Sequence, residues 1–395
     1  MLTCGTFTLP SEIGGVKSQL IVGPAGTGKS TLLSAMACAY LADGGRIAWL
    51  DLDYSSFVLA HLLGADYFDV GNTGRGALCP LACLDDEGGL GWLDAWFERL
   101  FARWDLQLDE RQAEDFQWSL REARRTGVRT LSGLRAIVPG EMQRVRRVLH
   151  HYIRYWGHIF DGDKRIDRTD GNERFDTANG CVNSVSRADS QANRLLTVYE
   201  LRGLMGLGKR ASAPATELIL HNVISRLDGS PAWILVDEFW QLLGDEVSAE
   251  WLFDAIRTLR KKNCGLIGAT QSLAEIVNSP YRDLLLESCP GKIFLPNTEA
   301  ASPYGREQYR AIGVSDHEIA CIARAIPKRQ AYFKSAIGCR LFDLDLGDVA
   351  KAILASTGYN DVSRARELLG QGDFLSCWLQ SRLPIATASA LTPRG

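Results

Sequence analysis

The sequence predicts an α/β protein in which a largely parallel sheet is interrupted by an all-helical insertion. Residues 18–22 and 46–52 are short apolar runs bounded by glycines, with a helical stretch between them, which is the pattern of a β-α-β unit. From 85 to 158 the apolar residues recur at three- and four-residue spacing, which predicts helices. Strand-like runs return at 195–201 and 232–236, so we expect the sheet to resume there.

These patterns also suggest how the chain is divided, because 395 residues are too many for one simple core. We expect the α/β core at 1–80 and 193–356, the helical insertion at 81–192 and a helical tail at 357–395. The end of the insertion, about 161–190, is polar and aperiodic, which predicts a loop. The tryptophans of the insertion have helical spacing, so we interpret them as core residues rather than as stacking platforms for bases.

The composition is that of a globular protein, with 46% hydrophobic and 23% charged residues and a net charge of −3. This small net charge gives no overall attraction to nucleic acid or to an anionic membrane, so neither partner is indicated, although a local basic patch stays open. The chain starts without a secretory signal, and no apolar stretch reaches the about 18 residues that a membrane-spanning helix needs. We therefore expect a cytoplasmic protein.

The candidate metal ligands do not form a recognisable motif. Cys79 and Cys83 are the closest pair among ten scattered cysteines, and they lack the second pair that is typical of a zinc site. His150, His151 and His158 have no acidic or cysteine partners at ligand spacing. We assign no metal to these residues and expect reduced, packed thiols.

Residues 23–30 read GPAGTGKS, a complete G-x-x-x-x-G-K-[ST] phosphate loop, and a strand-like run precedes it as this motif requires. The glycines allow backbone N–H groups to turn inward around phosphates. We expect Lys29 to reach the β and γ phosphates of ATP and the Ser30 hydroxyl to bind Mg²⁺, at the anion-favouring start of a helix. The expected nucleotide contacts are Gly23, Pro24, Ala25, Gly26, Thr27, Gly28, Lys29, Ser30 and Thr31.

A second motif lies at the end of the apolar run 232–236, where Asp237 and Glu238 follow directly. A buried strand that ends in two carboxylates beside a phosphate loop is the expected form of a Walker B strand. Asp237 would hold Mg²⁺, and Glu238 would act as general base on the attacking water. The alternative is that the two acids only supply favourable charge to the start of the next helix.

Gln271 is a candidate sensor of the γ phosphate. It follows a short apolar strand at 265–269, where the strand end would face that phosphate. An amide can donate to a phosphate oxygen and accept from the attacking water. A helix-capping Thr-Gln-Ser turn is the alternative.

Two pairs of cations could complete such a site. Arg257 and Arg260 lie three residues apart near the end of a helix predicted at 248–263, so they could face the nucleotide of a neighbouring subunit. Lys328 and Arg329, just before a strand-like run, form a second pair. An ordinary basic helix end explains the first pair equally well.

Asp51 and Asp53 follow the strand predicted at 46–52. Ligands of open α/β sheets collect at the carboxyl ends of the strands, so these two acids could line the site. A surface loop is an equal alternative.

Six segments in this order carry a family resemblance: GPAGTGKS, ILVDEFWQLL, IRTLRKKN, IGATQSLAEI, ESCPGKIFLPN and AIPKRQAYF. Together they resemble the C-terminal ATPase half of type IV secretion and conjugal transfer ATPases of the TrbE kind, the VirB-type traffic ATPases. The resemblance implies a RecA-like P-loop core similar to FtsK/HerA motors. It also implies the roles given above for Lys29, Ser30, Asp237, Glu238 and Gln271, and it favours Arg257 or Arg260 as an arginine finger acting in trans.

The resemblance further implies a homo-oligomer, a hexamer by analogy, that works on channel components at the inner membrane and powers pilus assembly or substrate transfer. Family members usually have a large N-terminal domain that contacts the channel, whereas this chain begins just before the phosphate loop. Two other functions use the same residues. One is a DNA-translocating motor like the coupling proteins, and the other is a nucleotide-binding scaffold or remnant without turnover.

Overall fold

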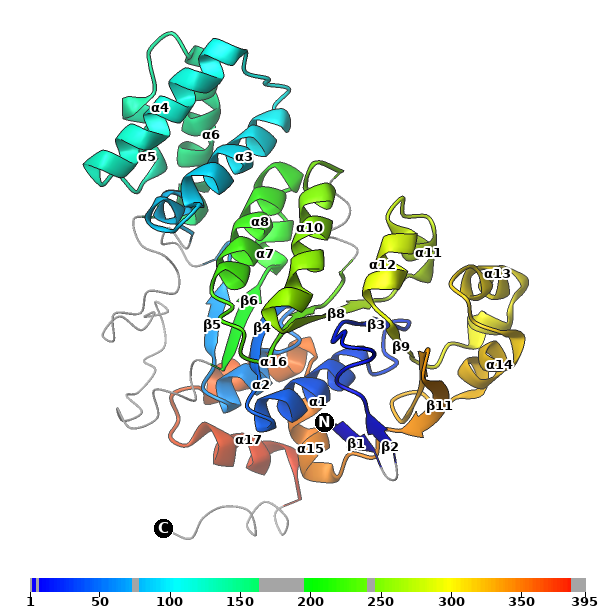
Figure 1. The fold of residues 1–395 in the computed structure, drawn as a ribbon. Coiled ribbons are helices and arrows are strands. Elements are labelled where there is room, and N and C mark those ends of the chain that lie inside the picture. The colour runs from blue at the N-terminus through cyan, green and yellow to red at the C-terminus, as the bar shows by residue number, and fades with distance from the viewer. Residues whose placement is uncertain (1, 5–6, 73–77, 163–194, 240–245, 385–395) are drawn as a thin grey trace.

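The structure is a computed structural model that describes residues 2–4, 7–72, 78–162, 195–239 and 246–384 (Figure 1). The predicted polar loop at 161–190 lies, apart from its first two residues, outside them. The strands within this part of the chain are β1 (Leu2–Cys4), β2 (Phe7–Leu9), β3 (Gln19–Val22), β4 (Arg46–Asp51), β5 (Asp66–Asp69), β6 (Leu196–Glu200), β7 (Ala232–Val236), β8 (Cys264–Thr270), β9 (Gly291–Phe294), β10 (Gln330–Ser335) and β11 (Gly338–Asp343).

The helices of the first half include those of the insertion: α1 (Lys29–Ala42), α2 (Phe57–Leu62), η1 (Pro80–Asp85), α3 (Gly89–Ala102), α4 (Glu110–Thr126), α5 (Leu131–Ile137) and α6 (Gln143–Phe160). The later helices are α7 (Arg202–Met205), α8 (Lys209–Ser225), α10 (Glu246–Leu259), η3 (Arg260–Lys262), α11 (Leu273–Val277), α12 (Arg282–Ser288), η4 (Thr298–Ala301), α13 (Pro303–Ala311), α14 (Asp316–Arg324), α15 (Asp348–Leu354), α16 (Tyr359–Leu368) and α17 (Phe374–Arg382).

Nine of the described strands form one sheet in the order β11-β10-β9-β3-β8-β7-β4-β6-β5. From β9 to β5 every neighbouring pair is parallel, and only β10 runs in the opposite direction, antiparallel to β9 and to β11. The predicted largely parallel sheet is therefore confirmed, with β8 inserted between β3 and β7. Because parallel strands share one carboxyl edge, this order places the ends of these three strands side by side.

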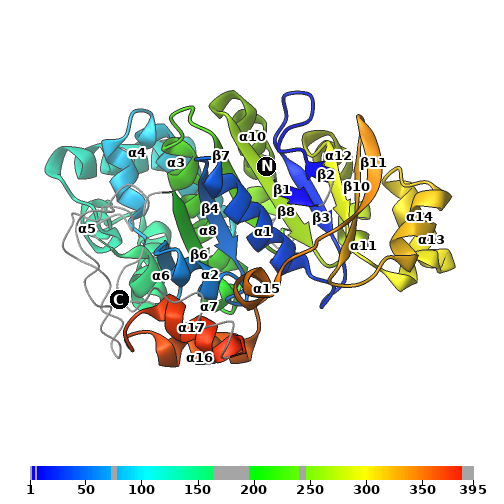
Figure 2. The same cartoon turned by 90° about the horizontal axis from the view of Figure 1, so that it is seen from below.

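Helices cover both faces of the sheet, and alternate residues of β7 show how. Trp233 and Leu235 pack in the same core as α1, whereas Ile234 and Val236 pack with α8, α10 and the insertion. The strand is buried on both faces, which explains its continuous apolar sequence. Below the sheet, α16 and α17 lie beside α2 and α15 (Figure 2).

Within the described residues, the insertion forms four α-helices, α3 to α6, between β5 and β6 in the sequence. Its core is continuous with that of α8, and Trp96 is completely buried there, as predicted. Trp118 of α4 is 53% exposed, so the interpretation of the insertion's tryptophans as core residues is wrong for this one. The domain boundaries given above stay a proposal.

Helix α8 contains a proline. The helix begins at Lys209, and Pro214 lies inside it. Proline has no N–H to donate to the carbonyl four residues earlier, which belongs to Arg210. The Tyr152 hydroxyl of α6 donates to that carbonyl instead. The insertion thus supplies the hydrogen bond that the proline removes.

Candidate functional site

The phosphate loop connects β3 to α1, as its sequence context predicts. Gly26 and Gly28 have φ values of 76° and 106°, which side chains disfavour. Gly23 is required for space, because a Cβ there would lie 2.5 Å from the Leu295 Cβ. The loop therefore needs its glycines for conformation and for close packing, and it leads into the N-terminal turn of α1, whose free N–H groups favour an anion.

Four predicted side chains meet at the carboxyl edge of the sheet. Lys29 Nζ lies 3.3 Å from Asp237 Oδ1 and forms an ion pair with Glu238 Oε1. Gln271 Nε2 donates to the same Glu238 oxygen at 2.6 Å. The strand order explains this meeting: Gln271 follows β8, which is hydrogen-bonded to β3 on one side and to β7 on the other. Lys29 and Glu238 thus belong to one cluster although they are 209 positions apart in the sequence.

Three residues of the cluster are buried, with Lys29, Asp237 and Glu238 each at most 8% exposed, whereas Gln271 is exposed. Burial raises the pKa of Asp237, and the Lys29 ammonium opposes that rise. Glu238 has φ of 52°, a left-handed conformation that is uncommon for residues other than glycine. Strain of about 1–3 kcal/mol is typical of such a residue and is concentrated at functional sites. Here the strained turn directs the Glu238 carboxylate toward Lys29 and Gln271.

Asp51 and Asp53 have different environments. Asp51 is fully buried at the end of β4, where it accepts hydrogen bonds from Ser55 Oγ at 2.6 Å and from Ser56. Ser55 Oγ also lies 3.4 Å from Asp237 Oδ2, so it links the two carboxylates. Burial raises the pKa of Asp51 to about 6. Asp53 instead pairs with Arg202 at 2.9 Å in an exposed loop.

Glu200 is a buried acid that sequence reasoning did not single out. It follows the same signal as Asp51, a carboxylate at the end of an apolar strand, and β6 lies next to β4. The backbone N–H groups of Tyr54 and Arg202 donate to it at 2.7 and 2.8 Å. Burial, followed by the nearby Asp51 charge, raises its pKa to about 9.

The two residues of the predicted cation pair Lys328 and Arg329 have different contacts in the structure. The Lys328 N–H donates to the Thr27 carbonyl of the phosphate loop at 3.0 Å, and a Cβ on Gly28 would lie 3.4 Å from the Lys328 Cα. Lys328 also has a positive φ of 60°. Arg329 turns away and pairs with Asp343 at 3.4 Å. Of this pair, only Lys328 is held against the loop.

Arg257 and Arg260 lie at the opposite edge of the sheet, before the first residue of β8. Arg257 pairs with Asp254 on its own helix at 3.1 Å. Arg260 lies near Gly15, where a Cβ would come within 3.2 Å of its Nη2. The seven residues of β8 separate these arginines from Gln271, a length of about 23 Å for a strand. Neither arginine belongs to the Lys29 cluster of its own chain.

The donor set at the cluster fits Mg²⁺. A hydroxyl from Ser30, next to Lys29 at the start of α1, and a carboxylate from Asp237 are the hard oxygen ligands that this ion prefers. Asp237 is buried and its carboxylate faces the helix that carries Ser30.

The cysteine pair has ordinary contacts: Cys79 Sγ donates to the Arg129 carbonyl at 3.1 Å, and Cys83 Sγ lies 3.9 Å from Asn222 Oδ1. Cys83, Asp86 and His221 place potential ligand atoms within 4.8 Å of one another. His221 is stacked on Trp92 with ring centroids 3.6 Å apart, and it is remote in sequence from the other two residues, so spacing could not reveal the group.

Two curated relatives match nearly the whole chain. A probable TrbE conjugal transfer protein of Sinorhizobium fredii is 33% identical over 388 residues, 95% of this chain and 54% of the relative. The conjugal transfer protein TrbE of Rhizobium radiobacter is 33% identical over 401 residues, 98% of this chain and 45% of the relative. The chain is therefore a homologue of the TrbE conjugal transfer proteins. It spans about half the length of these TrbE relatives, and a scan against protein-family profiles finds no match.

Solved structures agree on the fold. VirB4 of Thermoanaerobacter pseudethanolicus aligns with a TM-score of 0.63 at 14% identity, covering 84% of this chain and 90% of that one. The plasmid coupling protein TrwB with the ATP analogue ADPNP aligns with a TM-score of 0.55 at 16% identity, covering 84% of this chain and 85% of TrwB. The predicted P-loop NTPase fold is thereby confirmed. Within the described residues, no helix combines the length and apolarity needed to cross a bilayer.

Proposed function

We propose that this chain hydrolyses ATP with Mg²⁺ and that hydrolysis powers type IV secretion or conjugative transfer. The observation that carries the proposal is the cluster in which the buried Lys29 and the exposed Gln271 both contact one carboxylate oxygen of the buried Glu238. The TrbE names of the relatives support the biological setting. The process that hydrolysis powers would be either pilus assembly or substrate translocation.

The residues divide the chemistry among them. When ATP binds, Lys29 leaves the carboxylates of Asp237 and Glu238 and contacts the β and γ phosphates instead. Glu238 is then free to accept a proton from the attacking water. Gln271 orients that water and the γ phosphate through its amide. Ser30 and Asp237 would hold Mg²⁺, which neutralises charge on the phosphates when it is bound.

Lys328 adds a second cation to this arrangement. Its backbone is hydrogen-bonded to the phosphate loop, and its side chain is exposed beside that loop. Because its strained backbone is held in place by the loop, Lys328 lies where its ammonium can reach a phosphate of the same subunit.

We further propose that the active form is a homo-oligomer, with six subunits by family analogy. Arg257 and Arg260 are separated from Gln271 by the length of β8, so neither can reach the γ phosphate of its own subunit. A neighbouring subunit's phosphate is the remaining target, and one of the two arginines would then act as a finger in trans. The oligomer would work in the cytoplasm, at the inner-membrane base of a secretion channel.

The test is steady-state ATPase activity over a range of protein concentrations, for the wild-type chain, Glu238→Gln and Lys29→Ala. Turnover that rises cooperatively with concentration and is abolished in Glu238→Gln supports the proposal. Nucleotide binding without turnover in the wild type would overturn it in favour of a scaffold.

A mixing experiment tests the finger. Arg260→Ala and Lys29→Ala are inactive alone in this proposal, but a mixed oligomer contains interfaces that join an intact arginine to an intact Lys29. Recovery of activity on mixing supports action in trans, and the same experiment with Arg257→Ala identifies which arginine acts. Full activity of a monomer would remove the finger.

A further inference from the structure

The segment from residue 130 to 160, which contains α5 and α6, has a charge opposite to that of the whole chain. It contains five arginines and three histidines but a single acidic residue, Glu141, although the net charge of the chain is −3. Positive charge is thus concentrated on one helical hairpin of the insertion. Such a local concentration is the electrostatic footprint of a site for a polyanion.

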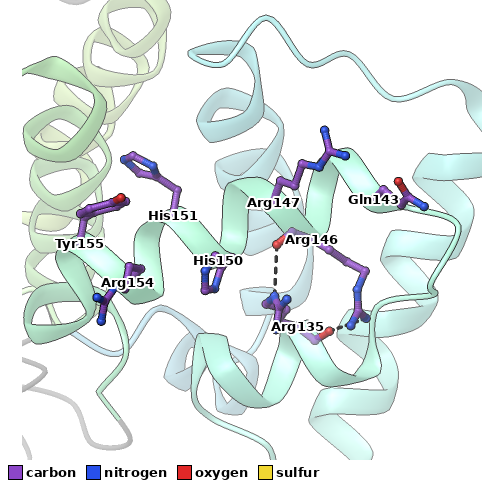
Figure 3. Close-up of a pocket in the computed structure, with 8 residues that line it drawn as sticks. All are labelled: Arg135, Gln143, Arg146, Arg147, His150, His151, Arg154 and Tyr155. Carbon is purple, nitrogen blue, oxygen red and sulfur yellow. Dashed lines mark hydrogen bonds between the residues drawn. The ribbon is translucent and has the colours of Figure 1, made fainter.

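Most of these arginines and histidines, together with Gln143 and Tyr155, line a hollow of about 440 Å³ (Figure 3). Arg147, His151, Arg154 and Tyr155 follow one another along α6 at intervals of three, four or one residue, so they form a stripe on the helix. Arg135 reaches the hollow from α5. We call the surface formed by Arg147, His150, His151, Arg154 and Tyr155 the basic hollow.

Two reciprocal hydrogen bonds join α5 to α6 next to the basic hollow. Arg135 Nε donates to the Arg146 carbonyl at 3.2 Å, and Arg146 Nη1 donates to the Arg135 carbonyl at 2.8 Å. These reciprocal bonds hold α5 against α6. Two arginines are therefore used to build the surface, and the others are presented by a preformed scaffold.

Arg147 and Arg154 are exposed, and neither has a carboxylate partner within the described part of the chain. Other exposed arginines do have such partners, for example Arg310 with Asp316 and Arg364 with Glu367. The acidic residues that flank α6 are Glu141 and Asp161. Asp161 accepts hydrogen bonds from Ser132, and Glu141 precedes α6. The two guanidinium groups are thus available to an external anion.

The aromatic residues of the basic hollow favour one class of polyanion. Tyr155 is 63% exposed, and its ring lies 4.6 Å from the His151 ring, measured between centroids. An exposed aromatic ring beside arginines is the arrangement that stacks on bases of a single strand while the backbone follows the charges. A membrane surface would instead favour an exposed apolar wedge of Trp, Phe or Leu on the same helix face, and the basic hollow contains none.

We propose that the basic hollow binds a single strand of nucleic acid, with Arg147 and Arg154 on phosphate groups and Tyr155 stacked on a base. The site lies in the insertion, apart from the Lys29 cluster, and it requires no hydrolysis. The proposal therefore stands independently of the ATPase activity.

The test is fluorescence anisotropy of a labelled oligothymidylate of about 20 nucleotides, titrated with the full chain without ATP at several salt concentrations. We expect binding at about 50 mM salt that weakens as salt rises. Arg147→Glu combined with Arg154→Glu should weaken it at least tenfold and lower the salt slope by about 1.4, since each single-strand phosphate contact contributes about 0.7. Tyr155→Ala should weaken it about tenfold with an unchanged slope.

The matched control is Arg121→Glu combined with Arg124→Glu, which makes the same charge change at exposed positions of α4 outside the hollow. An equal loss of binding in this control would overturn the proposal, as would absence of binding by the wild type. Sedimentation with phosphatidylserine vesicles adds a third outcome. If vesicle binding needs Arg147 and Arg154 while oligothymidylate binding does not, the surface is a membrane site. Unchanged thermal unfolding shows that each variant is folded.

Discussion

The Lys29 cluster and the basic hollow both concentrate charge, but they do so in opposite environments. In the cluster, Lys29 and Glu238 are buried and each charge contacts a specific partner. In the basic hollow, Arg147 and Arg154 are exposed to solvent. Charges at low dielectric interact strongly and depend on exact geometry, whereas exposed charges are screened and add up. A single substitution in the cluster should therefore remove most of the ATP turnover, whereas substitutions in the basic hollow should each weaken binding of nucleic acid by a smaller amount.

The largest expected effect tests the cluster side of this comparison. Glu238→Gln keeps the shape of the side chain but removes the base, so kcat should fall by about 10³-fold while ATP binding persists. Steady-state turnover and binding of a fluorescent ATP analogue measure the two quantities. Glu275→Gln is the control, because Glu275 is close enough for Glu238 to raise its pKa yet is not one of the residues in the cluster. An equal loss in Glu275→Gln would contradict a specific role for Glu238.

Gln271→Ala should lower kcat by about 10²-fold, because it removes a single orienting amide rather than the base. KM for ATP should change much less, since the amide acts on the attacking water and the γ phosphate. Turnover at saturating ATP checks this prediction. If Gln271→Ala turns over like the wild type, Gln271 is only part of the turn before α11.

Lys328→Ala should raise the KM for ATP by about tenfold, the effect of one exposed charge-assisted contact. The matched control is Arg329→Ala, which removes the neighbouring cation that pairs with Asp343 instead. Initial rates over a range of ATP concentrations separate KM from kcat. Equal effects of the two substitutions would show that Lys328 makes no specific contact with phosphate.

The buried acid Glu200 should make stability depend on pH. Its pKa is raised from 4.5 to about 9 in the folded chain, so the folded state holds a proton that the unfolded state has lost. Stability should therefore fall as pH rises between these values, by about 1.4 kcal/mol per pH unit for one such group. Glu200→Gln should flatten that fall in urea unfolding at pH 5 to 8, whereas Asp53→Asn, an exposed acid of the same edge, should leave it unchanged. A fall of equal steepness in Glu200→Gln would contradict the assignment.

The smallest expected effect comes from the hollow. Arg147→Glu combined with Arg154→Glu should change kcat for ATP by less than about twofold, because exposed charges far from the cluster are screened. Steady-state turnover without nucleic acid measures it. A large loss of kcat would mean that the basic hollow and the Lys29 cluster do not act independently.

Much of the cluster could be predicted because its signals are local. The phosphate loop, the acids after β7 and the glutamine after β8 each follow an apolar strand within one or two residues, and the parallel order of the strands brings them together. The TrbE resemblance rested on the same segments. Sequence spacing therefore specified both the fold and the cluster, while the roles of its residues stay proposals.

Other features depend on contacts between distant segments. The hydrogen bond from Lys328 to Thr27 joins residues about 300 positions apart, and no local pattern distinguishes Lys328 from Arg329. The carbonyl of Arg210 that Pro214 leaves without its helical donor accepts a hydrogen bond from the Tyr152 hydroxyl of another helix. The basic hollow was obscured by the net charge of the whole chain, which averages a positive hairpin with a more acidic remainder.

One feature of the sheet has a mechanical consequence. All seven residues of β8 are buried, and the strand is hydrogen-bonded to β3 and β7 on its two sides. A close-packed interior is hardly compressible and transmits displacement. A movement of Gln271 at one end would therefore shift the segment that carries Arg260 at the other end by a similar amount. In the proposed oligomer, this strand would therefore connect the site of a subunit's own nucleotide to the arginines that we propose contact its neighbour.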